Sequence, residues 1–173
     1  MLISQRMNDA INQQIGNEFA ASLQYVEMAS HFSADGLPVF AKHFFKQAEE
    51  ERDHAMRFVK FILDAGGVVQ IPTLPAPQHK FATAEEAVSL ALEQEKSVTR
   101  QISALAELAI KESDHITKTF LDWFLKEQLE EVSSMDNLLR MVQRAGEDRL
   151  LYVESHLSGS LSKGEPDPAK DED

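Results

Sequence analysis

The sequence contains no cysteine among its 173 residues. This absence excludes disulfides, thiolate metal sites, iron–sulfur clusters and cysteine nucleophiles, so any metal must be bound through oxygen and nitrogen. Basic residues are also scarce, because 17 lysines and arginines face 29 acidic residues, which gives a formal net charge of -12. A surplus of negative charge argues against nucleic acid as a partner and favours cations.

Long hydrophobic runs are missing as well. The N-terminal stretch MLISQRMNDAINQQ becomes polar too early for a secretory signal, and no run approaches the length of a membrane span. We therefore expect a cytoplasmic protein without a membrane partner. The hydrophobic share of 43% is sufficient, at this length, for one domain with a sizeable core.

Helical periodicity is the main pattern that is present. Ser4 is a plausible helix cap, and Thr83 with Glu86 forms a capping box. Helices of the lengths found here are typical of a bundle. The segments in which apolar or small residues recur at helical spacing are about 4–34, 38–65, 83–111 and 114–145.

The connections between these segments indicate the topology. Residues 66–82 contain three prolines and no helical period, so they predict an extended crossover along the bundle. Residues 147–157 predict a short amphipathic fifth helix, and the acidic tail 159–173 is expected to be disordered. The sequence therefore predicts one all-α domain, residues 1–158, built as a four-helix bundle with a long crossover between the second and third helices and a short C-terminal fifth helix.

The inward face of each long segment carries a carboxylate. A Glu and a His three residues apart on a helix can bind the same metal ion. Four ionised carboxylates balance two divalent cations, and oxygen donors with one imidazole suit iron, manganese or zinc. The polar residues that interrupt the four apolar stripes are Glu18, Glu51 with His54, Glu95, and Gln128 with Glu131.

Four stretches of sequence, NEFAASLQY, AEEERDHA, LEQEKSVT and WFLKEQLEEV, resemble bacterial non-haem ferritins, which are ferritin-like di-iron proteins. The resemblance extends to about Leu157. Many di-iron bundles carry a second Glu-x-x-His, but here Gln128-x-x-Glu131 replaces it, as in non-haem ferritins. Arg52 stands where bacterioferritins have a methionine that binds haem, so no haem is expected.

The resemblance implies roles for these side chains. Glu18, Glu51 and His54 would form the first iron site, and Glu51 would bridge to a second iron site formed with Glu95 and Glu131. The resemblance also implies that Gln128 is a hydrogen-bonding group beside the pair. Tyr25 and Trp123 would donate or relay electrons, with ordinary core packing as the alternative. A third iron site would be formed by Glu50, Glu127 and Glu130.

The function implied by the resemblance is iron storage. Ferrous iron would be oxidised by dioxygen or peroxide at the paired site, and ferric mineral would be stored inside a shell of 24 identical subunits. The alternatives are a di-iron enzyme acting on an organic substrate, a metal-free interaction module and a haem-binding bacterioferritin. Animal ferritins admit iron through acidic three-fold pores, but the matching positions here are Lys118 and Leu121, so a different acidic route is expected.

Overall fold

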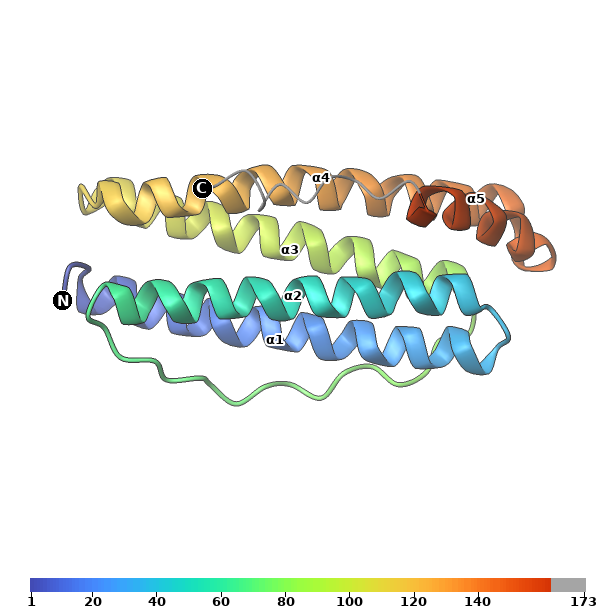
Figure 1. The fold of residues 1–173 in the computed structure, drawn as a ribbon, viewed down its shortest axis with the longest axis horizontal. Helices are drawn as coiled ribbons and strands as arrows, with labels where there is room; N and C mark the ends of the chain where they lie inside the picture. The colour runs from blue at the N-terminus through green and yellow to red at the C-terminus, as the bar shows by residue number, and fades with distance from the viewer. Residues whose placement is uncertain (163–173) are drawn as a thin grey trace.

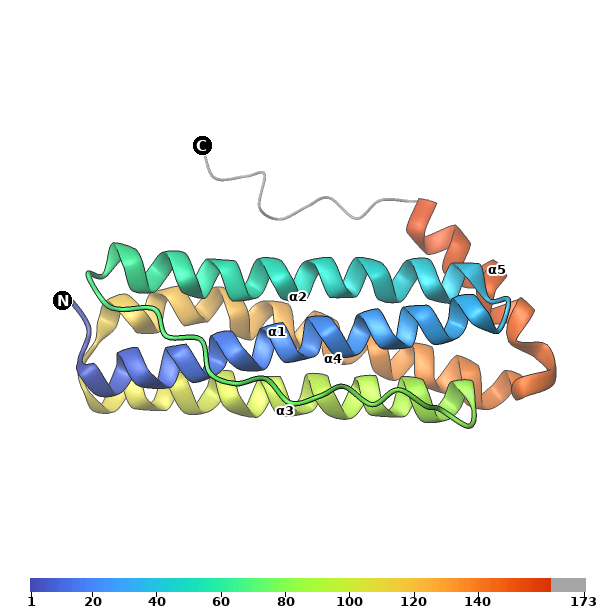
Figure 2. The ribbon, with the colours of Figure 1, turned by 90° about the horizontal axis from the view of Figure 1, so that it is seen from below.

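The computed structural model describes residues 1–162, and these residues form helices and connections without strands. The elements are α1 (Gln5–Ala34), α2 (Pro38–Asp64), α3 (Ala84–Lys111), α4 (His115–Ala145), the short 3-10 helix η1 (Glu147–Arg149) and α5 (Leu150–Ser162). Figures 1 and 2 show two antiparallel hairpins, α1 with α2 and α3 with α4, and a crossover that follows the whole length of the bundle beside α1. The predicted all-α architecture is confirmed.

The C-terminal helix is longer than the sequence predicts. We expected it to end near Leu157, but α5 continues to Ser162, so residues 159–162 are helical and do not belong to an unstructured tail. The polar residues after Leu157 include no proline before Pro166, and polarity alone does not end a helix. The rest of the predicted tail, residues 163–173, lies outside the described residues.

The predicted capping box opens α3 with one difference in its partners. The Thr83 hydroxyl accepts a hydrogen bond from the Glu86 backbone N–H at 3.1 Å. The Glu86 carboxylate reaches back one residue further than the usual pattern and accepts from the Ala82 backbone N–H at 2.7 Å. Both interactions satisfy N–H groups that have no partner within the helix.

The N-terminus of α2 is capped by a residue from the other end of the sequence. Leu37 precedes the helix and makes no side-chain cap. Glu154 of α5 is 7% exposed, and its Oε1 lies 2.7 Å from the backbone nitrogen of Val39 and 3.2 Å from that of Phe40. A carboxylate at this position satisfies two free N–H groups and interacts favourably with the helix dipole. The contact fixes α5 against the α1–α2 turn.

Glu154→Ala is therefore expected to lower the thermal unfolding temperature, because it leaves the buried start of α2 without an acceptor. Loss of a helix cap destabilises by about 1–2 kcal/mol, and a domain of this size then loses about 2–8 °C. The matched control is Ser155→Ala, which changes an exposed position of the same helix and should leave the unfolding temperature within about 1 °C. Equal unfolding temperatures for the two variants would contradict the capping role.

The hydrophobic core is divided into two clusters along the bundle. One cluster occupies the end at which α5 packs and includes Tyr25, Phe44 and Leu92. The other lies at the N-terminal end and includes Ile15, Phe58 and Val98. On each long helix buried polar residues lie between the two clusters, so the apolar core is interrupted by one polar layer near the middle of the bundle.

Buried amides of α1 hold the crossover in place. Asn8 accepts from the Val68 backbone N–H at 3.1 Å, and the Asn12 amide donates to the Val68 carbonyl at 2.8 Å. Gly16 permits a close approach, because a Cβ at that position would lie 2.4 Å from Pro72 Cγ. These contacts keep the crossover extended along the outside of the bundle, so that α3 begins at the far end.

Candidate metal centre

The polar layer contains the polar side chains that interrupt the apolar faces of the four long helices. The layer lies where all four long helices pass one another, so residues that are distant in sequence meet there. Glu51 is fully buried, and Glu131 is partly exposed although its Oε2 atom is buried. The residues that the structure brings into this layer are Glu18 from α1, Glu51 and His54 from α2, Glu95 from α3, and Gln128 and Glu131 from α4.

The potential ligand atoms form two overlapping groups. In the first, one atom each from Glu18, Glu51 and His54 lies within 4.8 Å of the others. In the second, the same is true of Glu51, Glu95 and Glu131. Glu51 belongs to both groups, and its Oε2 lies 3.7 Å from His54 Nδ1. The arrangement provides places for two ions, with one carboxylate able to bridge them.

Several buried atoms of this layer have no hydrogen-bond partner. They include both carboxylate oxygens of Glu51, Oε2 of Glu18, Oε2 of Glu131 and Nδ1 of His54. A buried polar atom without a partner is costly, and nearly all such atoms in folded proteins are paired. All these atoms can donate an electron pair to a cation, so bound metal ions would satisfy them together.

The electrostatics of the layer favour protons or metal ions. Burial raises the pKa of Glu51 well above its usual value, and the charges of Glu131, Glu95 and Glu18 raise it further. Burial likewise raises the pKa of Glu18 to about 7. Burial lowers the pKa of His54 to about 4, so its imidazole is neutral at neutral pH and can act as a ligand. Metal binding would therefore displace protons from the carboxyl groups.

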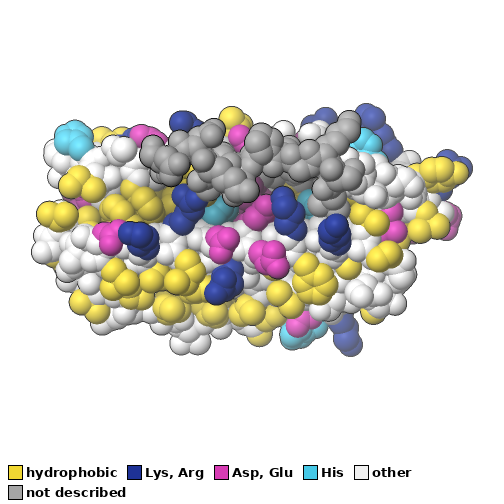
Figure 3. Space-filling model, in the orientation of Figure 1, with side chains coloured by type: hydrophobic (Ala, Val, Ile, Leu, Met, Phe, Trp, Pro, Cys, Tyr) yellow, Lys and Arg dark blue, Asp and Glu magenta, His cyan; other side chains and the backbone are white. Residues whose placement is uncertain are grey.

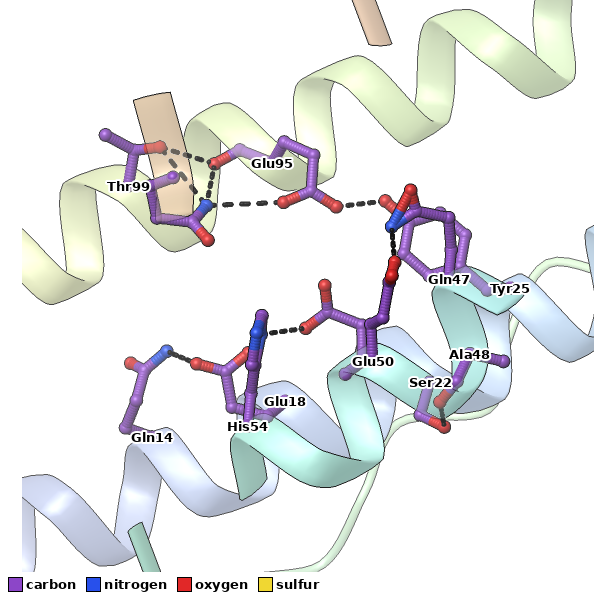
Figure 4. A network of polar contacts seen from close by, with 12 residues as sticks. Gln14, Glu18, Ser22, Tyr25, Gln47, Ala48, Glu50, His54, Glu95 and Thr99 are labelled. Atoms are coloured by element: carbon purple, nitrogen blue, oxygen red, sulfur yellow. Dashed lines mark hydrogen bonds and ion pairs between the residues drawn. The ribbon is translucent and has the colours of Figure 1, made fainter. Parts of the chain in front are cut away.

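A shell of hydrogen bonds orients the carboxylates (Figure 4). Gln14 donates to Glu18 Oε1 at 2.9 Å. Gln128, which we predicted as a hydrogen-bonding residue, donates to Glu95 Oε2 at 3.2 Å, and the Tyr25 hydroxyl donates to Glu95 Oε1. Sequence reasoning missed Gln14, although its position one turn before Glu18 could have indicated it.

Of the three residues predicted for a further iron site, one belongs to a group of three potential ligands among the described residues. Glu127 shares a group with His54 and Glu131, with ligand atoms within 4.8 Å of one another. No group of three among the described residues contains Glu50 or Glu130. Glu50 instead accepts a hydrogen bond from Gln47 at 2.8 Å and pairs with Lys46, while Glu130 is exposed.

The residues matching the three-fold pore of animal ferritins offer no acidic opening. Leu121 is fully buried in the N-terminal core cluster. Lys118 forms an ion pair with Asp122 on the same helix. Neither side chain could therefore attract a cation, and the acidic route expected elsewhere stays a prediction.

Several known proteins are similar to this chain in sequence. A family model described as a ferritin-like domain matches residues 8–145. The chain is 45% identical over 158 residues to ferritin BfrB of Mycolicibacterium smegmatis, covering 91% of this chain and 87% of that protein. It is 34% identical over 153 residues to the bacterial non-heme ferritin of Staphylococcus haemolyticus, covering 88% of this chain and 92% of that protein.

The fold is also found among solved structures. An open pore ferritin from the archaeon Archaeoglobus fulgidus superposes with a TM-score of 0.88 at 34% sequence identity, covering 91% of this chain and 97% of that chain. A closed form of this archaeal protein, engineered by site-directed mutagenesis, gives a TM-score of 0.87, covering 90% of this chain and 96% of that one. Within the described part of the chain, none of the helices has the length and apolar character needed to span a bilayer.

Proposed function

This chain belongs to the ferritin family of iron-storage proteins, and we propose that its buried polar layer is a ferroxidase centre. Two ferrous ions would bind there as substrate. Glu18, Glu51 and His54 would hold one ion, and Glu51, Glu95 and Glu131 would hold the other. The observation that carries the proposal is that five buried oxygen and nitrogen atoms without hydrogen-bond partners belong to residues of these two groups.

The reaction requires that charge and electrons balance. Two ferrous ions give up two electrons, which with two protons reduce dioxygen to hydrogen peroxide or hydrogen peroxide to two waters. Oxidation adds two positive charges to a site whose four carboxylates balance two divalent ions, so hydroxide or oxide must enter with the ferric product. The carboxylates set the positions of the two ions, which supplies the proximity that a two-electron step needs.

A route for ferric product is offered by the third group of ligand atoms. Glu127 lies beside His54 and Glu131, so an ion that leaves the pair meets another carboxylate at once. Glu127 is partly exposed, whereas Glu51 is fully buried, and the group therefore leads from the core towards the surface. We place the third iron position at this group, with Glu127 in place of the Glu50, Glu127 and Glu130 set that the sequence predicts.

We further propose a hollow shell of 24 subunits. Large apolar side chains remain exposed on α1, α2 and the crossover, and a monomeric protein rarely keeps many of them together. Figure 3 shows hydrophobic side chains gathered along the lower part of one face of the molecule. Contacts between copies would cover such side chains. The exposed apolar residues on these three segments are Leu23, Val26, Phe45, Met56, Leu63, Val68 and Ile71.

The decisive experiment adds ferrous iron in air to the purified iron-free protein and follows ferric absorbance. We expect a fast phase that saturates at about two ferrous ions per subunit, as a paired site requires. Gel filtration of the same sample should give the size of a shell and not that of a 19.4 kDa monomer. Oxidation no faster than in buffer would contradict the ferroxidase proposal, and a monomeric elution volume would contradict the shell.

Gln14→Leu should weaken metal binding without removing a ligand, because the Glu18 carboxylate loses the amide that orients it. Loss of such a supporting group reduces metal affinity by about tenfold. Titration with Co²⁺, which does not oxidise in this assay, measures the affinity. Gln13→Leu is the matched control, because Gln13 is exposed on the same helix. In the described part of the chain, its side chain forms a hydrogen bond only with Asn17. An unchanged affinity in Gln14→Leu would contradict the role.

A further inference from the structure

The indole of Trp123 contacts two side chains of α2. The guanidinium carbon of Arg57 stands 3.9 Å from the centroid of the indole ring, within the range of a cation–π interaction. The indole also packs against the His54 imidazole in a T-shaped arrangement, with ring centroids 5.5 Å apart and ring planes at 80°. Phe124 packs against both rings at 73° and 88°. A proposed iron ligand therefore rests against an aromatic ring that carries a cation on its face.

Tyr25, the other aromatic side chain predicted beside the centre, has an environment of opposite charge. It is fully buried, and its hydroxyl donates to Glu95. Removing an electron from an aromatic ring leaves a positive charge, which a neighbouring cation opposes and a neighbouring carboxylate favours. Glu95 can in addition accept the phenolic proton. The two aromatic residues therefore differ in how readily each is oxidised.

We propose that Arg57 is a positioning residue that keeps Trp123 reduced while iron is oxidised, so that the indole holds the His54 ring in place and supplies no electron. The inference rests on the proposed ferroxidase function. The step that Arg57 opposes begins when a ferrous ion gives one electron to hydrogen peroxide, whose O–O bond breaks to hydroxide and a hydroxyl radical. That radical takes one electron from the indole, which becomes a radical cation, and the radical becomes a second hydroxide.

The first test uses the iron-free protein and measures a potential. Trp123 is the only tryptophan, and the Trp123→Phe variant identifies its oxidation wave in square-wave voltammetry. Arg57→Gln should lower the oxidation potential of Trp123, because the cation is gone. Arg57→Lys keeps the charge and should stay closer to the wild type than Arg57→Gln does. Equal potentials in the wild type and Arg57→Gln would overturn the proposal.

The second test follows the protein during turnover. Repeated additions of ferrous iron and hydrogen peroxide are followed by mass spectrometry of the peptide that contains Trp123. Oxygen adducts on this peptide should be about threefold more abundant in Arg57→Gln than in the wild type, and Arg57→Lys should reduce the excess. A wild type that fails to oxidise iron defeats the proposed function. A wild type that oxidises iron, with equal tryptophan damage in all three proteins, defeats the role of Arg57 alone.

Discussion

Replacing Glu51 by alanine is expected to reduce the initial rate of ferrous oxidation by about a hundredfold, which removes the fast phase. Glu51 is the one residue that belongs to both groups of ligand atoms at the proposed pair, so its loss weakens both iron positions. The two ions would then no longer be held together, and a two-electron reduction of dioxygen would require an encounter between separate ions. Stopped-flow absorbance after mixing with ferrous iron in air gives the rate.

The control for this variant lies two residues earlier on the same helix. Glu49 is an exposed glutamate of α2, so Glu49→Ala removes the same functional group without touching the polar layer. The Glu49→Ala rate should stay within about twofold of the wild type, as for a surface substitution. His54→Ala should lie between the two, because it removes a ligand from only one of the two paired iron positions. A fast phase that persists in Glu51→Ala would show that oxidation occurs elsewhere.

The second large effect concerns stability and has opposite signs with and without metal. In the iron-free protein, burial and the neighbouring carboxylates raise the pKa of Glu51, so at neutral pH folding costs free energy either to protonate this carboxylate or to bury its charge. Glu51→Gln removes that cost at nearly constant volume. We expect the iron-free variant to be more stable than the wild type by about 1–2 kcal/mol, or about 2–8 °C in unfolding temperature.

Zn²⁺, which is not oxidised, should reverse this order. A ligand that binds only the folded state stabilises it by about 2.7 kcal/mol at a hundredfold excess over its dissociation constant. The wild type should therefore gain unfolding temperature with Zn²⁺, whereas Glu51→Gln should gain little, because an amide is a poor ligand for the bridging position. Differential scanning calorimetry with and without Zn²⁺ measures both effects. An iron-free Glu51→Gln variant less stable than the wild type would contradict the charge argument.

Much of the fold could be predicted because its signals are local. Ser4 and Thr83 cap the helices that their sequence positions indicated, and the prolines of the crossover exclude a helix there. The predicted end of α5 near Leu157 was wrong, because the polar residues that follow carry no stop signal of the kind that proline provides. The cap of α2 could not be predicted, since Glu154 lies 115 residues from Val39.

The candidate site, like the fold, could be predicted from the sequence only in part. The stripe pattern identified the carboxylates and His54 because a helix face repeats at a fixed spacing, and the structure brings them together as that pattern requires. Their assignment as iron ligands stays a prediction. The pattern could not show that Glu127 approaches His54 while Glu50 turns to Gln47, because that choice depends on rotamers and on the offset between α2 and α4.

The sequence by itself determined four long helices, their inward faces and the height at which each face turns polar, because helical spacing and caps act over a few residues. Only the tertiary structure decided which potential ligand atoms lie close enough to share an ion, since packing sets the distances between residues of different helices. It also placed the Arg57 cation on Trp123 and the Glu154 carboxylate on the start of α2. Neither contact follows from spacing along the chain, because each joins two elements whose relative position is set by the packed bundle.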